Sequence, residues 1–195
     1  ARVAATFAAD PALVVLTGPA ASPAGGLGSG RWRAEAGPIT PANVWTSVIE
    51  FNLFLRREVA LALGGFDDRL GPGTRWGSAE GNDLVIRAIG AGHAARYDPD
   101  LRIVHPDKRL TDVARARAAA YGRGLGFVLR RHGVPAPVWL PYVIRPCGGM
   151  LLAALRFRFG DAGYYWGSLT GRLAGLLAPG TREGVPLRPI TSVAP

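Results

Sequence analysis

The chain has 195 residues, a hydrophobic content of 48% and a formal net charge of +9, which comes almost entirely from arginine because Lys108 is the only lysine. This length and composition support one domain with a hydrophobic core plus an appendage and exclude a disordered chain. The 27 glycines and 16 prolines indicate many turns and exclude a simple helical bundle. The single cysteine, Cys147, excludes an intrachain disulfide, and its apolar neighbours predict a buried, unreactive thiol.

The first half of the sequence alternates short apolar runs with helical patterns. An alternation this dense favours an α/β layer over a β-sandwich. A long Gly/Pro/Ser-rich stretch at 20–41 predicts a substrate-facing loop. The elements that we predict are strands at 12–17, 94–98 and 101–105, a strand at 47–55 leading into a helix at 56–63, and a helix at 79–89 after a glycine-rich loop.

The second half is basic and apolar. Thr111 can cap a long helix that continues to about His132 and carries five arginines. Residues 137–159 are apolar but broken by prolines and paired glycines, and 164–177 predict a second apolar helix. Neither segment gives an uninterrupted run of about 20 apolar residues, so we expect them to lie in a membrane interface, with aromatic side chains at the boundary and arginines toward the headgroups.

Two acids stand in the first turn of the helix predicted at 79–89. Glu80 and Asp83 are candidates for the general base that removes a proton from an attacking hydroxyl group, with Glu80 ranked first. A structural role is the alternative, because acids at this end of a helix interact favourably with its dipole and Asp83 can pair with Arg87. A functional and a structural role are also open for two other residues. Asp67 can shape the acceptor site or bond local amides. Trp76 can be a sugar platform or a core anchor.

The segment GGFDDRLGPGTRWGSAEGNDLVIRAIGAGHAARYDPDLRIVH resembles the acceptor-side signature of family 2 glycosyltransferases. That signature combines GGFDE, a glycine-rich loop, an acidic E-D-x-D-L-x-x-R motif and a strand that ends in histidine. The resemblance implies an α/β fold that is a partial GT-A fold lacking its N-terminal half. It also implies that the base follows the glutamate directly, a position that is Gly81 here. The substrate-binding residues that it implies are Asp67, Trp76, Gly77 and Arg87.

The resemblance further implies a divalent cation, Mg or Mn, that bridges the diphosphate of the donor. His105 is the candidate ligand in this chain, with a structural role as an equal alternative. No Asp-x-Asp motif precedes residue 67, and Asp98-Pro99-Asp100 lies in a predicted turn. We therefore expect the main metal ligands, and the donor-binding half, to lie outside this chain, so that the chain alone is inactive.

These features predict a glycosyltransferase of bacterial cell-envelope polysaccharide synthesis, which moves a sugar from a nucleotide-sugar donor to a glycan or lipid-linked acceptor. The expected location is the cytoplasmic face of the cell membrane, on an anionic membrane surface. The alternative is a non-catalytic, basic membrane-surface module; no nucleic-acid partner is expected, because no RNA-binding or helix-turn-helix motif is found. The predicted regions are the glycosyltransferase part (1–108), a helical membrane-associated region (109–180) and a flexible tail (181–195).

Overall fold

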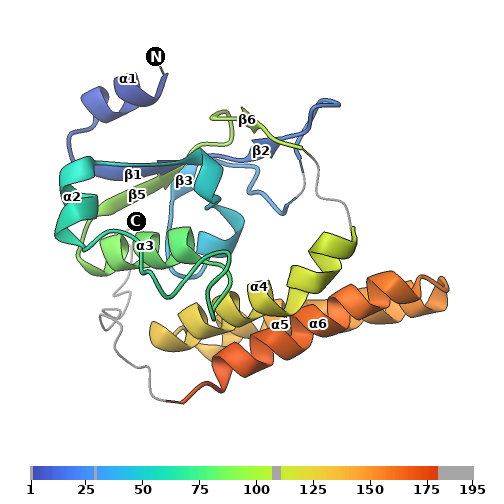
Figure 1. Ribbon diagram of the computed structural model, residues 1–195. Helices are drawn as coiled ribbons and strands as arrows, with labels where there is room; N and C mark the ends of the chain where they lie inside the picture. Colours follow the sequence, from blue (N-terminus) through green and yellow to red (C-terminus); the bar gives the residue numbers. More distant parts are fainter. Residues whose placement is uncertain (1, 29, 107–110, 180–195) are drawn as a thin grey trace.

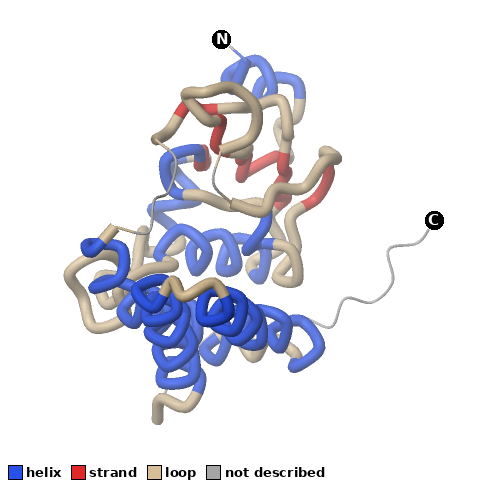
Figure 2. The backbone as a smooth tube through the Cα atoms, turned by 90° about the vertical axis from the view of Figure 1, so that its right-hand side faces the viewer, coloured by secondary structure: helices blue, strands red, loops and turns tan. Residues whose placement is uncertain are grey.

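The structure is a computed structural model that describes residues 2–28, 30–106 and 111–179. It has an α/β part at the N-terminal side and three long helices at the C-terminal side (Figures 1 and 2). The predicted boundary at 108/109 and the predicted tail at 181–195 lie outside the described residues. The helices are α1 (Arg2–Ala9), α2 (Arg57–Ala62), α3 (Glu80–Gly90), α4 (Asp112–Arg131), α5 (Ala136–Leu155) and α6 (Phe159–Leu176), and the strands are β1 (Leu13–Thr17), β2 (Ala20–Ala21), β3 (Gly37–Pro38), β4 (Leu53–Leu55), β5 (Ala94–Tyr97) and β6 (Ile103–Val104).

A mixed four-stranded sheet in the order β3-β5-β1-β4 forms the centre of the α/β part. Its central pair, β1 and β5, is parallel, and the chain connects the two strands through α3, as a parallel pair requires a crossover. All five residues of β1 are buried, which agrees with the continuous apolar run in the sequence. The remaining pair, β2 and β6, forms a separate parallel ladder. The predicted mixed α/β architecture is confirmed.

The strand predicted at 47–55 is mostly not a strand. Two short 3-10 turns occupy Val44–Thr46 and Glu50–Asn52, and only Leu53–Leu55 pairs with β1. The side chain of the buried Asn52 donates to the carbonyls of Pro19 (3.1 Å) and Leu101 (2.7 Å). Long-range contacts thus override the local strand propensity of this segment.

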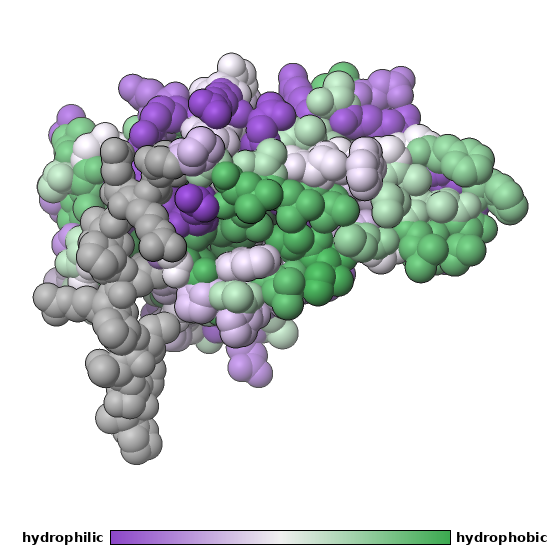
Figure 3. Space-filling model, turned by 90° about the horizontal axis from the view of Figure 1, so that it is seen from below, coloured by the Kyte–Doolittle hydropathy of each residue, from purple (hydrophilic) through white to green (hydrophobic). Residues whose placement is uncertain are grey.

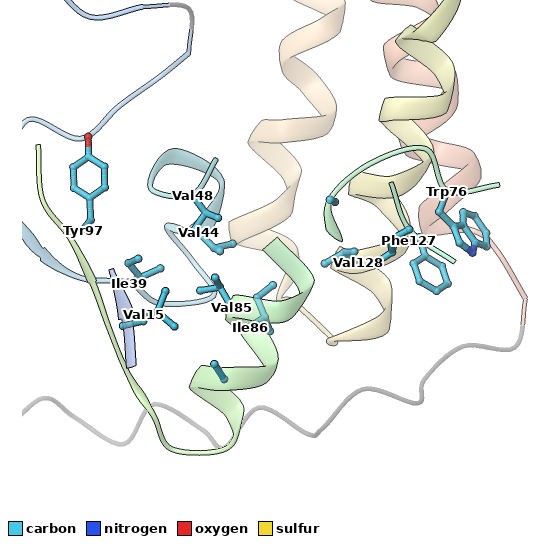
Figure 4. Packing of buried hydrophobic residues seen from close by; sticks show 14 of the residues in the cluster. Val15, Ile39, Val44, Val48, Trp76, Val85, Ile86, Tyr97, Phe127 and Val128 are labelled. Carbon is cyan, nitrogen blue, oxygen red and sulfur yellow. The ribbon is translucent and has the colours of Figure 1, made fainter. Parts of the chain in front are cut away.

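One hydrophobic cluster joins the sheet, α3 and the first long helix. Val15 and Ile39 pack toward Val85 and Ile86 of α3, and Phe127 of α4 belongs to the same cluster (Figure 4). Helix α4 therefore shares the core of the α/β part and completes it.

Helices α4 and α6 approach each other through glycines. A Cβ atom on Gly122 of α4 would stand 2.5 Å from the Ser168 carbonyl oxygen, and a Cβ on Gly175 of α6 would stand 2.6 Å from the Phe127 amide nitrogen. These contacts leave no room for side chains at the helix–helix interface, so the glycines here set the interhelical distance.

Helix α5 continues through Pro141 and Pro146, where the sequence indicated an interruption. Proline lacks the amide that would bond the carbonyl four residues earlier, so Pro146 leaves the Tyr142 carbonyl without its helical donor. The guanidinium group of Arg172 in α6 donates to this carbonyl instead. A contact from the neighbouring helix thus stabilises α5 at a residue that would otherwise break it.

The outer face of α5 is exposed. Among the described residues, α5 is the one helix whose length and composition would suffice to cross a membrane, and 17% of that window is buried. Cys147 is exposed on this helix, so the prediction of a buried thiol is wrong. Ile144, Leu151 and Leu152 of the same helix are exposed as well.

Candidate functional site

Glu80 is the first residue of α3 and follows a strained residue. Ala79 caps the helix with φ 76° and ψ 17°, in the left-handed region that non-glycine residues rarely adopt. The carboxyl group of Glu80 lies over the glycine-rich loop, where a Cβ on Gly71 would stand 3.4 Å from Glu80 Cδ. The Glu80 Oε2 atom is buried and has no hydrogen-bond partner. A buried, unpaired carboxylate oxygen is costly, and it is the kind of group that a functional site retains.

A second acid, Glu50, reaches the same place from a distant segment. A Cβ on Gly81 would stand 3.1 Å from Glu50 Cγ, so the missing side chain at position 81 makes room for Glu50. Desolvation raises the pKa of the Glu50 carboxyl, hydrogen bonds from the Glu50 and Gly81 amides oppose this, and the charge of Glu80 adds to the increase. The outer surface of Glu50 remains exposed, and surrounding protein atoms desolvate its carboxyl end.

Sequence reasoning missed Glu50. The available signal was an acid within the apolar run SVIEFNLFL, where a charge is unusual unless it has a partner or a function. Its neighbour at Gly81 is 31 positions away and could not be inferred from spacing.

One of the two acids, Glu50, lines a cleft between α3 and the long helices, and Ala79, which precedes Glu80, also lines it. The cleft has a volume of about 210 Å³ and is lined by Glu50, Ser78, Asn82, Tyr121 and Arg172, among others. Hydroxyl, amide and guanidinium groups can orient a hydroxylated ligand, and a carboxylate beside them can accept its proton.

Asp83 is completely buried, and three basic side chains surround its carboxylate. Arg87 Nε lies 2.8 Å from Oδ2, His132 Nε2 lies 2.8 Å from Oδ1, and Arg131 Nη1 lies 3.4 Å from Oδ1. Burial alone would raise the pKa of Asp83, but the hydrogen bonds from His132 and Arg87 and the charge of Arg131 lower it. A carboxylate that is fully paired and stabilised in its charged form is a weak base, so this geometry favours the structural alternative for Asp83.

Arg87 also has a structural arrangement. Besides Asp83, it donates to the carbonyls of Leu63 and Gly65, both at 2.6 Å. It therefore fastens the end of α2 to α3. Its guanidinium group thus donates to three protein groups, which favours a structural role for Arg87.

Asp67 is likewise paired, with Arg69 at 2.8 Å and with Arg131. The hydrogen bonds from Arg69 hold the pKa of Asp67 well below its usual range. Burial opposes this effect, and the hydrogen bond and charge of Arg131 add to it. Asp67 and Asp83 thus share Arg131, which places both acids in one ionic network at the end of α4.

Trp76 is buried, and its ring stacks on Phe127 of α4 with a centroid separation of 4.3 Å (Figure 4). This contact favours the core-anchor alternative. Gly77 has φ +56°, and a Cβ there would stand 2.6 Å from the backbone of Ala120. Both residues thus pack the glycine-rich loop against α4.

His105 is exposed, and its ring stacks on Phe51 at 4.0 Å, with Nδ1 2.9 Å from the Pro106 carbonyl oxygen. Within 2–28, 30–106 and 111–179, no group of three or more His, Cys, Asp or Glu side chains could hold a metal ion. A single exposed imidazole does not fit Mg or Mn, which prefer several oxygen ligands.

Comparison of the chain with protein-family models, with curated proteins and with solved structures finds no match. The fold and the cleft define a mixed α/β protein with a glutamate pair at the start of a central helix, backed by three long helices.

Proposed function

We propose that this chain is the acceptor-binding part of a glycosyltransferase that moves a sugar from a nucleotide-sugar donor to a hydroxyl group of a glycan or lipid-linked acceptor. The observation that supports it best is the buried, unpartnered Oε2 atom of Glu80 beside Glu50, at a strained helix start. The motif resemblance supports the same reaction, with a partial GT-A fold. On this proposal the donor-binding half and the Mg or Mn ligands belong to a segment outside these 195 residues.

In the reaction, Glu80 accepts the proton of the acceptor hydroxyl as its oxygen attacks the anomeric carbon of the donor. The new carbon–oxygen bond forms while the bond from that carbon to the donor phosphate breaks, and the nucleoside diphosphate leaves with the electron pair. Glu50, whose raised pKa favours its neutral form, limits the negative charge beside Glu80. Asp83 and Arg87 hold the helix that carries Glu80.

A transfer assay on a protein that includes the donor-binding half tests this assignment. Glu80→Gln keeps the shape of the side chain but removes the basic oxygen, so turnover should fall about 100-fold or more while donor binding persists. Glu58→Gln, on the exposed side of α2, is the matched control and should keep full turnover. Near-normal turnover of Glu80→Gln would refute the proposed base.

We further propose that α5 and the α5–α6 turn lie on the cytoplasmic surface of the membrane. Figure 3 shows a broad apolar face over the long helices. Its exposed large side chains include Leu140, Ile144, Leu151, Leu152, Leu155, Phe157 and Phe159. An apolar face of this extent marks an interaction surface, and the exposed Arg145 and Arg156 beside it suit anionic headgroups.

Most arginines of α4 do not support this attachment. Arg115, Arg123, Arg130 and Arg131 bond to protein groups. The expectation that the arginines of this region face headgroups is therefore wrong for these four residues. The proposed membrane attachment rests on the exposed apolar side chains of α5 and the α5–α6 turn.

A further inference from the structure

A large groove opens between α5, α6 and the loop that carries Trp45. Its volume is about 970 Å³, at the upper end of the range of about 300–1,000 Å³ typical of small-molecule sites. Most of its lining is apolar and comes from α5, including Leu140, Ile144 and Leu152. The shape and lining suit a long apolar ligand.

The charged residues that line this groove are all cations. Arg31, Arg145 and Arg172 contribute to its wall, and no Asp or Glu does. Arg172 lies deepest: Nη1 donates to the Tyr142 carbonyl, while Nε is buried and has no partner. Burial lowers the pKa of Arg172, Tyr164 opposes this effect, and Arg145 lowers the pKa further. An anion between the two guanidinium groups would relieve their repulsion and supply the missing acceptor.

The groove adjoins the cleft that Glu50 lines. Five residues line both spaces, and Arg172 is one of them; the others are Trp45, Leu125, Tyr164 and Ser168. Arg172 therefore stands between the groove along α5 and the cleft beside Glu50.

We propose that this groove binds a single amphiphile with a phosphate head, which lies at Arg172 and Arg145, and an alkyl chain, which lies along α5. Resting on the proposed function, the amphiphile is the acceptor: a lipid phosphate that carries a saccharide, whose hydroxyl group enters the cleft at Glu50, the neighbour of Glu80. On this proposal the acceptor is lipid-linked and not a free glycan.

Calorimetric titration of the whole chain with monomeric decyl phosphate tests the binding. We expect one site per chain and an affinity at least tenfold higher than for inorganic phosphate or for decyl trimethylammonium, which lack the chain and the anion respectively. Each methylene added to the chain should increase the affinity by up to about fourfold. Equal affinity for inorganic phosphate would leave only a free-anion site, and equal affinity for the cationic amphiphile would leave only an apolar surface; either result overturns the proposal.

The arginine variants locate the head. Arg172→Gln should weaken decyl phosphate binding about tenfold or more, because a charge-assisted bond is lost. Arg117→Gln, an exposed site on α4 with the same change of charge, should bind like the original chain. If Arg172→Gln does not fold, because Tyr142 loses its donor, Arg145→Gln on the exposed rim should still weaken binding severalfold. Unchanged binding in a folded Arg172→Gln, or in Arg145→Gln, overturns the proposal.

These titrations need no donor and no catalysis. Decyl phosphate binding, together with no sugar transfer by a protein that includes the donor-binding half, would refute the proposed function and leave the groove assignment intact. Transfer to a free glycan without decyl phosphate binding would support the proposed function and refute the groove assignment.

Discussion

His132 Nε2 and Asp83 Oδ1 lie 2.8 Å apart, and both side chains are almost fully buried, which ties the end of α4 to the first turn of α3. This bond joins residues 49 positions apart, and it places the helix that carries Glu80 against the long helices. The acidic motif thus has two kinds of acid: one that is paired and one, Glu80, with a free oxygen.

Replacing Asp83 should unfold the protein at lower denaturant concentration. Asp83→Asn removes the charge that compensates buried cations, so the free energy of unfolding at pH 7 should fall by about 3–5 kcal/mol in urea denaturation. The pKa of Asp83 is lowered in the folded state. Its stabilising effect is therefore complete above the unfolded pKa and is lost as pH falls through the folded pKa. The difference between the two proteins should shrink below about pH 4.

Asp112→Asn is the matched control for that change. Asp112 also stands in the first turn of a helix and pairs with an arginine, but its side chain is 97% exposed. Its loss should cost less than about 1 kcal/mol. A similar small cost for Asp83→Asn would contradict the ionic network described above.

Glu50 should show the opposite dependence on pH. Its folded pKa is raised, so its contribution to stability is greatest below the unfolded pKa and is lost as pH rises through the folded pKa. Glu50→Gln should consequently gain stability, relative to the original protein, between pH 4 and pH 8 in thermal unfolding scans, and it should reduce transfer. Glu58→Gln should show no such trend, and the same result for both variants would argue against a desolvated Glu50.

Gly77→Ala should disrupt the loop behind the cleft. The substitution combines a strained backbone at φ +56° with a Cβ 2.6 Å from the Ala120 backbone. We expect a loss of about 2–4 kcal/mol in the free energy of unfolding. Gly73→Ala separates the two effects, because Gly73 has φ +88° and open space around its Cβ. Its cost should be about 1 kcal/mol, and equal costs would mean that the loop does not dock on α4.

Membrane attachment through α5 predicts a site-specific loss of vesicle binding. Leu151 on α5 is 61% exposed and Leu61 on α2 is 60% exposed. Leu151→Ser should weaken sedimentation with anionic vesicles about fivefold or more, because the apolar insertion is lost, whereas Leu61→Ser should not. Binding to anionic vesicles should also decrease with salt. Equal binding to neutral and anionic vesicles at low salt would speak against the proposed orientation, and so would equal effects of Leu151→Ser and Leu61→Ser.

The sequence by itself determined the elements whose signals are local. The apolar run of β1, the glycine-bounded helix α3 and the Thr111 cap of α4, whose hydroxyl accepts from the Ala114 amide at 3.2 Å, all follow from short-range propensity and burial pattern. The same signals placed Glu80 and Asp83 in the first turn of α3. They could not assign different roles to these two acids, because both satisfy the same local pattern.

Only the tertiary structure decided which acid is free. Asp83 is paired because the end of α4 brings Arg131 and His132 to it, and Glu80 gains Glu50 as a neighbour because Gly81 leaves the space that Glu50 fills. In the same way, Arg172 supports α5 at Pro146 only because α6 packs beside it. Desolvation and ion pairing depend on which distant segments meet, and spacing along the chain does not encode that meeting.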